Sequence, residues 1–188
     1  MRLFALKRWL ALGLLGSAAG GCTLPDGATG AGVCGPTRPA PDIGPWDSDA
    51  AAFEQRVIAL TNERRASGGC CGAKGCFGPS VALKLNDNLR VAARRHAADM
   101  AARSYFSHES PEGGTLGDRL ARAGFGGCSA GENIAQGQRD PDAVVEAWMG
   151  REGHCANILA PGYRAMGVGY VDDPAVELRR VWVQNFGG

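Results

Sequence analysis

Two histidines and one glutamate have the side chains that could carry chemistry in this chain. They are His108, Glu132 and His154, which are separated along the sequence by 24 and 22 residues. Two imidazoles and one carboxylate form the ligand set of an open zinc site, in which water takes the fourth position. The long intervals differ from the fixed i, i+4 spacing of a helical HExxH pair, so a polar cluster without metal remains equally open.

The remaining histidine, His96, is expected to belong to the core. It shares the apolar face of a periodic segment with Ala93 and Met100. A histidine in that position usually has its ring nitrogen hydrogen-bonded inside the protein and binds no ligand.

The sequence contains the residue pattern of a serine-hydrolase motif but lacks the secondary structure that the motif requires. Residues 127–131 read Gly-Cys-Ser-Ala-Gly, with Asp140 and His154 downstream in the order of a Ser, Asp, His triad. A nucleophile elbow needs a buried strand before the serine and a helix after it, whereas here a Gly-rich segment precedes Ser129 and a strand-like run follows. We therefore expect no serine nucleophile.

The first 21 residues have the pattern of a secretory signal peptide. Arg2, Lys7 and Arg8 precede a short uncharged apolar run that is too short to span a bilayer as a helix. The run ends in Ala-Gly-Gly before Cys22, which resembles the site at which bacterial lipoproteins are cleaved and acylated. We expect export, with a lipid anchor to the membrane at Cys22; ordinary cleavage after Ala19 is the alternative.

If Cys22 carries lipid, six of the seven cysteines remain, an even number that in an oxidising compartment predicts up to three disulfides. Cys128 lies just before Glu132, and Cys155 directly follows His154. A Cys128–Cys155 bridge would bring both segments to one cleft and stabilise the fold by about 3.5 kcal/mol. The pairing of the others stays open; they are Cys34, Cys70, Cys71 and Cys76.

The elements that must position these residues can be read from caps and periodicity. Residues 22–45 contain five of the ten prolines and are expected to form an extended tether, followed by one domain over residues 46–188. Helices are expected after Asp47 or Ser48, after the N-cap Asn86, after the Thr115 and Asp118 capping box, and after Asp140-Pro141. Strands are expected near residues 132–135, 165–171 and 179–186, the last two adjacent, which indicates an α+β fold with helices packed on a small antiparallel sheet.

The charge balance excludes nucleic acid as an expected partner. The chain has 20 basic and 19 acidic residues, and the leader holds three of the basic ones, so the remainder is slightly acidic.

Six motifs follow one another along the chain: Leu85-Asn86, Phe106-Ser107-His108, Gly131-Glu132-Asn133-Ile134-Ala135, Gly153-His154, Gly167-Val168-Gly169 and Trp182-Val183-Gln184-Asn185-Phe186-Gly187. Together they resemble the CAP (SCP/PR-1) domain superfamily, most closely its secreted bacterial branch. The resemblance implies an α-β-α sandwich with a central cleft lined by two histidines and two acidic residues. His108, Glu132 and His154 match three of the four. Arg151 stands where the eukaryotic pattern has a glutamate, which leaves Glu152 as a candidate for the fourth.

From these patterns we expect an exported, lipid-anchored binding module of the bacterial envelope. Its cleft would take a small molecule, a lipid, another envelope ligand or one divalent metal, zinc above all. The alternative is a metal-assisted or acid/base hydrolase in which Glu132 is ligand or base and His108 and His154 are ligands. A purely structural role for the polar cluster is the third possibility.

Overall fold

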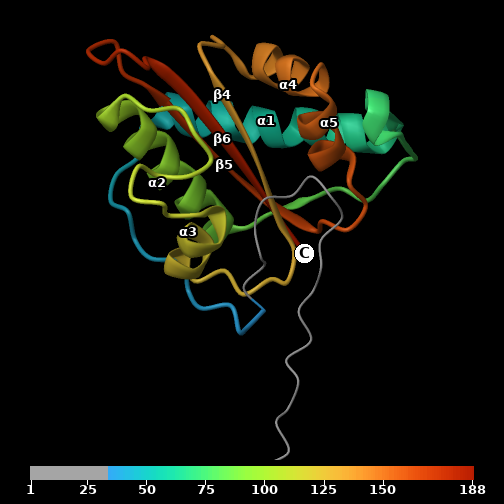
Figure 1. Cartoon of the computed structure of the whole chain (residues 1–188), viewed down its shortest axis with the longest axis horizontal. Helices are drawn as coiled ribbons and strands as arrows, with labels where there is room; N and C mark the ends of the chain where they lie inside the picture. Colours follow the sequence, from blue (N-terminus) through green and yellow to red (C-terminus); the bar gives the residue numbers. More distant parts are fainter. Residues whose placement is uncertain (1–33) are drawn as a thin grey trace, which may run out of the picture.

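Four strands form one twisted sheet with helices on both faces (Figure 1). The computed structural model describes residues 34–188. The predicted signal peptide, the predicted lipid anchor at Cys22 and the first part of the predicted tether lie outside these residues. Among residues 34–188 no helix is both long enough and apolar enough to cross a membrane.

The sheet has the order β3-β5-β6-β4. Strands β4, β5 and β6 pair antiparallel, and the short strand β3 pairs parallel with β5, which the sequence did not indicate. Strand β4 is therefore an edge strand, paired only with β6. The bounds are Lys84–Leu85 for β3, Ala130–Gln136 for β4, Ala165–Asp172 for β5 and Arg180–Gly187 for β6.

The predicted helix starts are confirmed by the capping side chains. Asp47, Asn86 and Asp140 each accept a hydrogen bond from a backbone N–H in the first turn, and Thr115 with Asp118 forms the capping box. A fifth helix, α5, was not predicted; it contains His154. The bounds are Ser48–Ser67 for α1, Asp87–Arg103 for α2, Leu116–Ala123 for α3, Pro141–Met149 for α4 and Glu152–Leu159 for α5.

Helices α2 and α3 cover one face of the sheet, and α1, α4 and α5 cover the other (Figure 1). This confirms the predicted α-β-α sandwich. Two glycines allow α2 to lie directly on β5, because a Cβ at Gly167 or Gly169 would overlap the backbone of α2 at Arg90 or Arg94. The close approach fixes the height of α2, and of His96 on it, above the sheet.

The three disulfides differ from the predicted pairing. Cys128 pairs with Cys34, Cys155 pairs with Cys71, and Cys70 pairs with Cys76. The predicted Cys128–Cys155 bridge is wrong because Cys128 lies before β4, beside the C-terminal Gly188, whereas Cys155 is buried on α5 against the loop that carries Cys71. That loop is a small hairpin of β1 (Gly69–Cys70) and β2 (Cys76–Phe77) around the 3-10 helix η1 (Gly72–Lys74).

The described part of the predicted tether is docked against the domain. The Gly35 and Arg38 N–H groups donate to the carbonyls of Gly126 and Gly124, and the Asn88 amide donates to the Arg38 carbonyl. Together with the Cys34–Cys128 disulfide, these contacts extend the folded unit back from residue 46 to at least residue 34.

Candidate functional site

A cleft of about 1130 Å³ lies at the open edge of β4. Ile134, Ala135 and Gln136 of β4 line it, the segment around His108 and helix α3 form one wall, and α4 with the start of α5 forms the other. Because the two walls belong to opposite faces of the sheet, the edge of β4 is the floor between them. The sandwich therefore produces the cleft without a dedicated subdomain.

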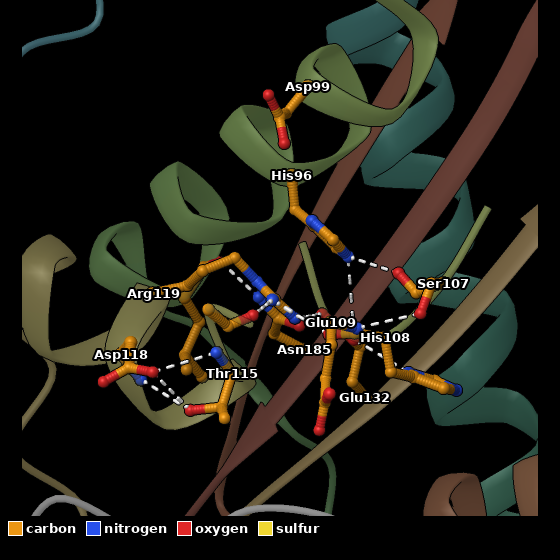
Figure 2. A network of polar contacts seen from close by, with 12 residues as sticks. His96, Asp99, Ser107, His108, Glu109, Thr115, Asp118, Arg119, Glu132 and Asn185 are labelled. Atoms are coloured by element: carbon orange, nitrogen blue, oxygen red, sulfur yellow. Dashed lines mark hydrogen bonds and ion pairs between the residues drawn. The ribbon is translucent and has the colours of Figure 1, made fainter. Parts of the chain in front are cut away.

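Glu132 does not line the cleft, but it is hydrogen-bonded to His108, which does, and it is the buried centre of a polar network (Figure 2). Its Oε1 accepts from His108 Nδ1 over 2.8 Å, and its Oε2 accepts from the Arg119 guanidinium over 2.7 Å. The Asn185 amide, oriented with its nitrogen toward the carboxylate, donates to the same Oε2 over 3.1 Å. Both carboxylate oxygens are thus occupied by donors of the chain itself.

These partners keep Glu132 ionised. Burial alone raises the pKa of this carboxyl, but the hydrogen bond from His108 and the charges of Arg119 and His96 outweigh burial and hold the pKa below its ordinary value. An ionised Glu132 can only accept, so His108 carries its proton on Nδ1 and presents Nε2 to the cleft. His108 is 42% exposed at its side chain, and Glu132 only 1%.

His96 confirms the expectation of a buried histidine with a hydrogen-bonded ring. Its Nε2 donates to the Ser107 carbonyl over 3.0 Å and lies 4.0 Å from Glu132 Oε1. Burial lowers the pKa of His96. The hydrogen bond holds the segment that carries His108 against α2, so His96 positions the cleft wall without lining the cleft.

His154 lines the cleft from α5, opposite His108. Burial first, and then the charges of His108 and Arg151, lowers the pKa of His154, so its imidazole is neutral at pH 7. Its Nδ1 is buried and has no hydrogen-bond partner among the described residues. The structure therefore brings two imidazoles to one cleft, as the sequence predicted, but on separate walls.

The fourth predicted cleft residue, Glu152, is not in the cleft. Its Oε1 accepts from the Ala73 N–H over 3.0 Å, so the side chain covers the Cys-rich loop. Glu152 is the first residue of α5 and does not line the cleft. Arg151 lines the cleft instead, and a cation takes the place that the resemblance assigned to an acid.

The residues present do not fit a three-ligand metal site. Within residues 34–188 no group of three His, Cys, Asp or Glu side chains is placed to hold a metal ion. The reason is local: the oxygens of Glu132 are taken by His108 and by a guanidinium that already neutralises the carboxylate. Two imidazoles alone remain as nitrogen ligands.

The serine-hydrolase motif also forms no site. Strand β4, not a helix, follows Ser129, and Asp140 caps α4 through the Ala143 N–H. Within the described residues, Nδ1 of His154, the histidine of that motif, has no hydrogen-bond partner, and no hydroxyl or thiol is hydrogen-bonded to His108.

Sequence reasoning missed Arg119, which is 9% exposed and holds the site together. Besides Glu132 it binds the carbonyls of His108 and Gly114, so it joins α3, β4 and the cleft wall. Its position offered a signal, because it shares the buried side of α3 with Leu116 and Leu120. An arginine on the apolar side of a helix needs buried acceptors, either an acidic side chain or backbone carbonyls.

Comparison with known proteins identifies relatives of the whole sandwich. The family model described as "CAP: Cysteine-rich secretory protein family" matches residues 59–186. Protein YkwD of Bacillus subtilis is 38% identical over 141 residues, which cover 75% of this chain and 49% of that protein. The membrane protein YlbC of the same organism is 33% identical over 141 residues, covering 75% of this chain and 36% of that protein. This chain thus spans about half or less of their length.

Solved structures agree with these sequence matches. An extracellular protein of Bacillus anthracis that contains an SCP domain is 33% identical, with a TM-score of 0.62, over 77% of this chain and 44% of that one. An outer surface protein of Borrelia burgdorferi has a TM-score of 0.58 at 16% identity, over 75% of this chain and 92% of that one, and so shares the fold.

Proposed function

This chain belongs to the cysteine-rich secretory protein (CAP) family, and from that membership we propose that it is an exported binding module of the bacterial envelope. Its ligand would occupy the cleft at the edge of β4 and contact His108 and His154. The similarity to an extracellular SCP-domain protein of Bacillus anthracis supports export.

The state of Glu132 is the observation that carries the proposal of binding. The carboxylate is ionised and buried, and both its oxygens accept hydrogen bonds, one from His108 and one from Arg119. It therefore orients His108 and does not reach a substrate. The cleft offers a ligand the polar side chains of His108, His154 and Arg151 and an apolar wall around Trp148. A pocket with a largely apolar lining and a few fixed polar groups is typical of ligand sites.

Acid/base hydrolysis is the second candidate, and one distance favours it. The 2.8 Å hydrogen bond between Glu132 and His108 Nδ1 is the arrangement by which a carboxylate orients a catalytic imidazole. In this version His108 Nε2 would take a proton from water, since no hydroxyl or thiol of the described residues is bonded to it.

Tryptophan indole signals can test where ligands bind. Trp148 lines the cleft, whereas Trp46 lines a different hollow. We expect fragments of a small-molecule library to shift the Trp148 indole N–H resonance and leave that of Trp46 unmoved. His108→Asn, which removes the imidazole but keeps an amide donor toward Glu132, should weaken cleft-binding fragments about tenfold.

His154→Ala serves as a second variant, and Zn²⁺ alone as a second probe. Fragments that shift only Trp46, or none that shift Trp148, would overturn the binding proposal. If the wild type retains one equivalent of zinc and both histidine variants lose it, the predicted metal site is present, and the conclusion that these residues do not fit a metal is wrong. If the wild type hydrolyses an ester or amide fragment and His108→Asn does not, the protein is a hydrolase and the proposal of a binding module is wrong.

A lipid anchor at Cys22 is the second part of the proposal. The six cysteines from Cys34 onward pair with one another, so none of them is left to pair with Cys22. We expect the protein expressed in a bacterial host to partition into Triton X-114 and Cys22→Ser to remain in the aqueous phase, because a thioether-linked diacylglycerol adds two buried acyl chains. Equal partition of both proteins into the aqueous phase would refute the anchor and favour free secretion.

A further inference from the structure

The floor of the cleft is the unpaired edge of a β-sheet, and we propose that the cleft binds an extended peptide of a partner protein, which adds to β4 as a further strand. This inference rests on the proposed binding function and names the class of ligand. It depends on the hydrogen-bonding groups of β4 and not on the histidines.

The direction of the backbone groups of β4 follows from their contacts. The carbonyls of Glu132 and Ile134 accept from the side chains of Asn157 and Trp148, so they point away from β6. Just beyond the strand, the Gly137 N–H donates to Arg180 of β6. In an antiparallel pair the N–H and C=O of one residue point to the same side and alternate along the strand. The backbone groups of Ile134 and Gln136 therefore face the cleft.

The outward N–H groups on this edge are left without partners. Within residues 34–188 nothing accepts from the N–H of Ile134 or of Gln136, and both residues line the cleft. Two outward carbonyls, by contrast, are closed off by Asn157 and Trp148. An edge whose donors are free suits a ligand that supplies carbonyl acceptors at regular intervals, which is what an extended peptide does.

The walls fit the side chains of such a strand. Successive side chains of an added strand would point to opposite faces of the sheet. One set would reach Phe106, which is 42% exposed, and Leu116 of α3; the other would reach Ala147 and Trp148 of α4. Backbone hydrogen bonds would supply affinity, and these two walls would select the alternate side chains.

The position of the edge favours a flexible peptide over a second copy of this chain. Sheet edges that are exposed in soluble proteins invite pairing with other chains and are usually protected. Here α3 stands on one side of the edge and α4 with α5 on the other. The β4 edges of two copies would each be recessed between such walls, whereas a single extended segment can enter between them.

Proline at Gln136 provides the test. Gln136 is exposed at the end of β4, and its N–H faces the cleft, so Gln136→Pro removes a donor without removing a bond to β6. Gln136→Ala is the matched control because it keeps the N–H. The probes are linear peptides selected on the wild type from a phage-displayed random library, then synthesised with fluorescein. By fluorescence anisotropy we expect Gln136→Ala to bind within about twofold of wild type and Gln136→Pro to bind at least about tenfold more weakly.

A second arm does not depend on the variant. N-methylation of the peptide backbone at alternate residues places the methyl groups against β4 in one of the two registers, which should abolish binding, and away from β4 in the other, which should leave binding intact. Peptides that shift Trp148 but tolerate Gln136→Pro and both methylation registers would overturn strand addition. If no peptide binds while small fragments still shift Trp148, strand addition fails and the proposed function stands; if neither shifts Trp148, both fail.

Two other occupants of the edge are also outcomes of the test. Concentration-dependent dimerisation that Gln136→Pro abolishes would assign the edge to a second copy of this chain. Binding of a synthetic peptide of residues 22–33 in preference to the selected peptides would assign it to the chain's own N-terminal segment. Either result overturns the proposal of a partner protein.

Discussion

Arg119→Met is expected to lower the free energy of unfolding by about 3–5 kcal/mol at pH 7, because it leaves the Glu132 carboxylate buried without its cation. The Glu132 side chain is 1% exposed and that of Arg119 is 9% exposed, so solvent offers little compensation. The hydrogen bonds from Arg119 to the carbonyls of His108 and Gly114 are lost as well. Urea denaturation of both proteins measures the difference.

The effect should depend on pH in a defined direction. In the wild type the pKa of Glu132 lies below its ordinary value of 4.5, so the stability that the ionised group contributes is present above that value and is lost as the pH falls through the folded-state pKa. Burial raises the pKa of Glu132, and the charge of Arg119 lowers it. When Arg119 is removed, the pKa rises, and Glu132 takes up a proton at a higher pH. The penalty in Arg119→Met should therefore shrink between pH 7 and pH 4.

Arg122→Met is the matched control, since Arg122 lies on the same helix and is not buried. We expect it to change stability by at most about 0.5 kcal/mol. A loss in Arg119→Met as small as that of the control would show that Glu132 is not a buried anion held by Arg119, and the assignment of Glu132 as an orienting group would fall with it.

The helix starts and strands were predictable because their signals are local. Asn86 and the pair Thr115 and Asp118 cap helices through backbone groups within four residues of themselves. The apolar face of α2 likewise identified His96 as buried. These patterns depend on neighbouring residues only, so they predict the local structure without knowledge of the tertiary packing.

Helix α5 and the function of Arg119 depend on distant parts of the chain. Helix α5 has no capping side chain at its N-cap, Arg151, and is held instead by the Cys71–Cys155 disulfide and by Glu152 on the Ala73 N–H. No local pattern specifies those partners. The same holds for the cleft floor, which is an edge only because β6 lies between β4 and β5.

The wrong disulfide prediction has the same origin and changes how the cleft is understood. Cys128 and Cys155 were paired because each lies near a predicted cleft residue, which is a statement about sequence distance. In the structure Cys155 ties α5 to the loop at Cys71, and both cysteines are buried in the core and do not line the cleft. The position of His154 is therefore fixed by a bridge to the first loop and not by a bridge to the segment of Glu132.

Removing this bridge should produce the second large effect. Cys71 is 3% exposed and Cys155 is 1% exposed, and the two are 84 residues apart in sequence. The double variant Cys71→Ala/Cys155→Ala is expected to lose about 4–5 kcal/mol, because a long loop is no longer closed in the unfolded chain. Backbone hydrogen exchange in α5, including at His154, should accelerate more than in α2. Denaturant titration without reductant and exchange mass spectrometry measure the two effects.

The adjacent bridge is the matched control for loop length. Cys70 and Cys76 are separated by only 6 residues, so Cys70→Ala/Cys76→Ala should lose only about 2 kcal/mol although it alters the same hairpin. If both double variants lose the same amount, the effect arises from disrupting the hairpin and not from loop closure. If α5 exchanges no faster without Cys71–Cys155, packing of its buried Ile158 and Leu159 holds the helix, and the bridge does not position His154.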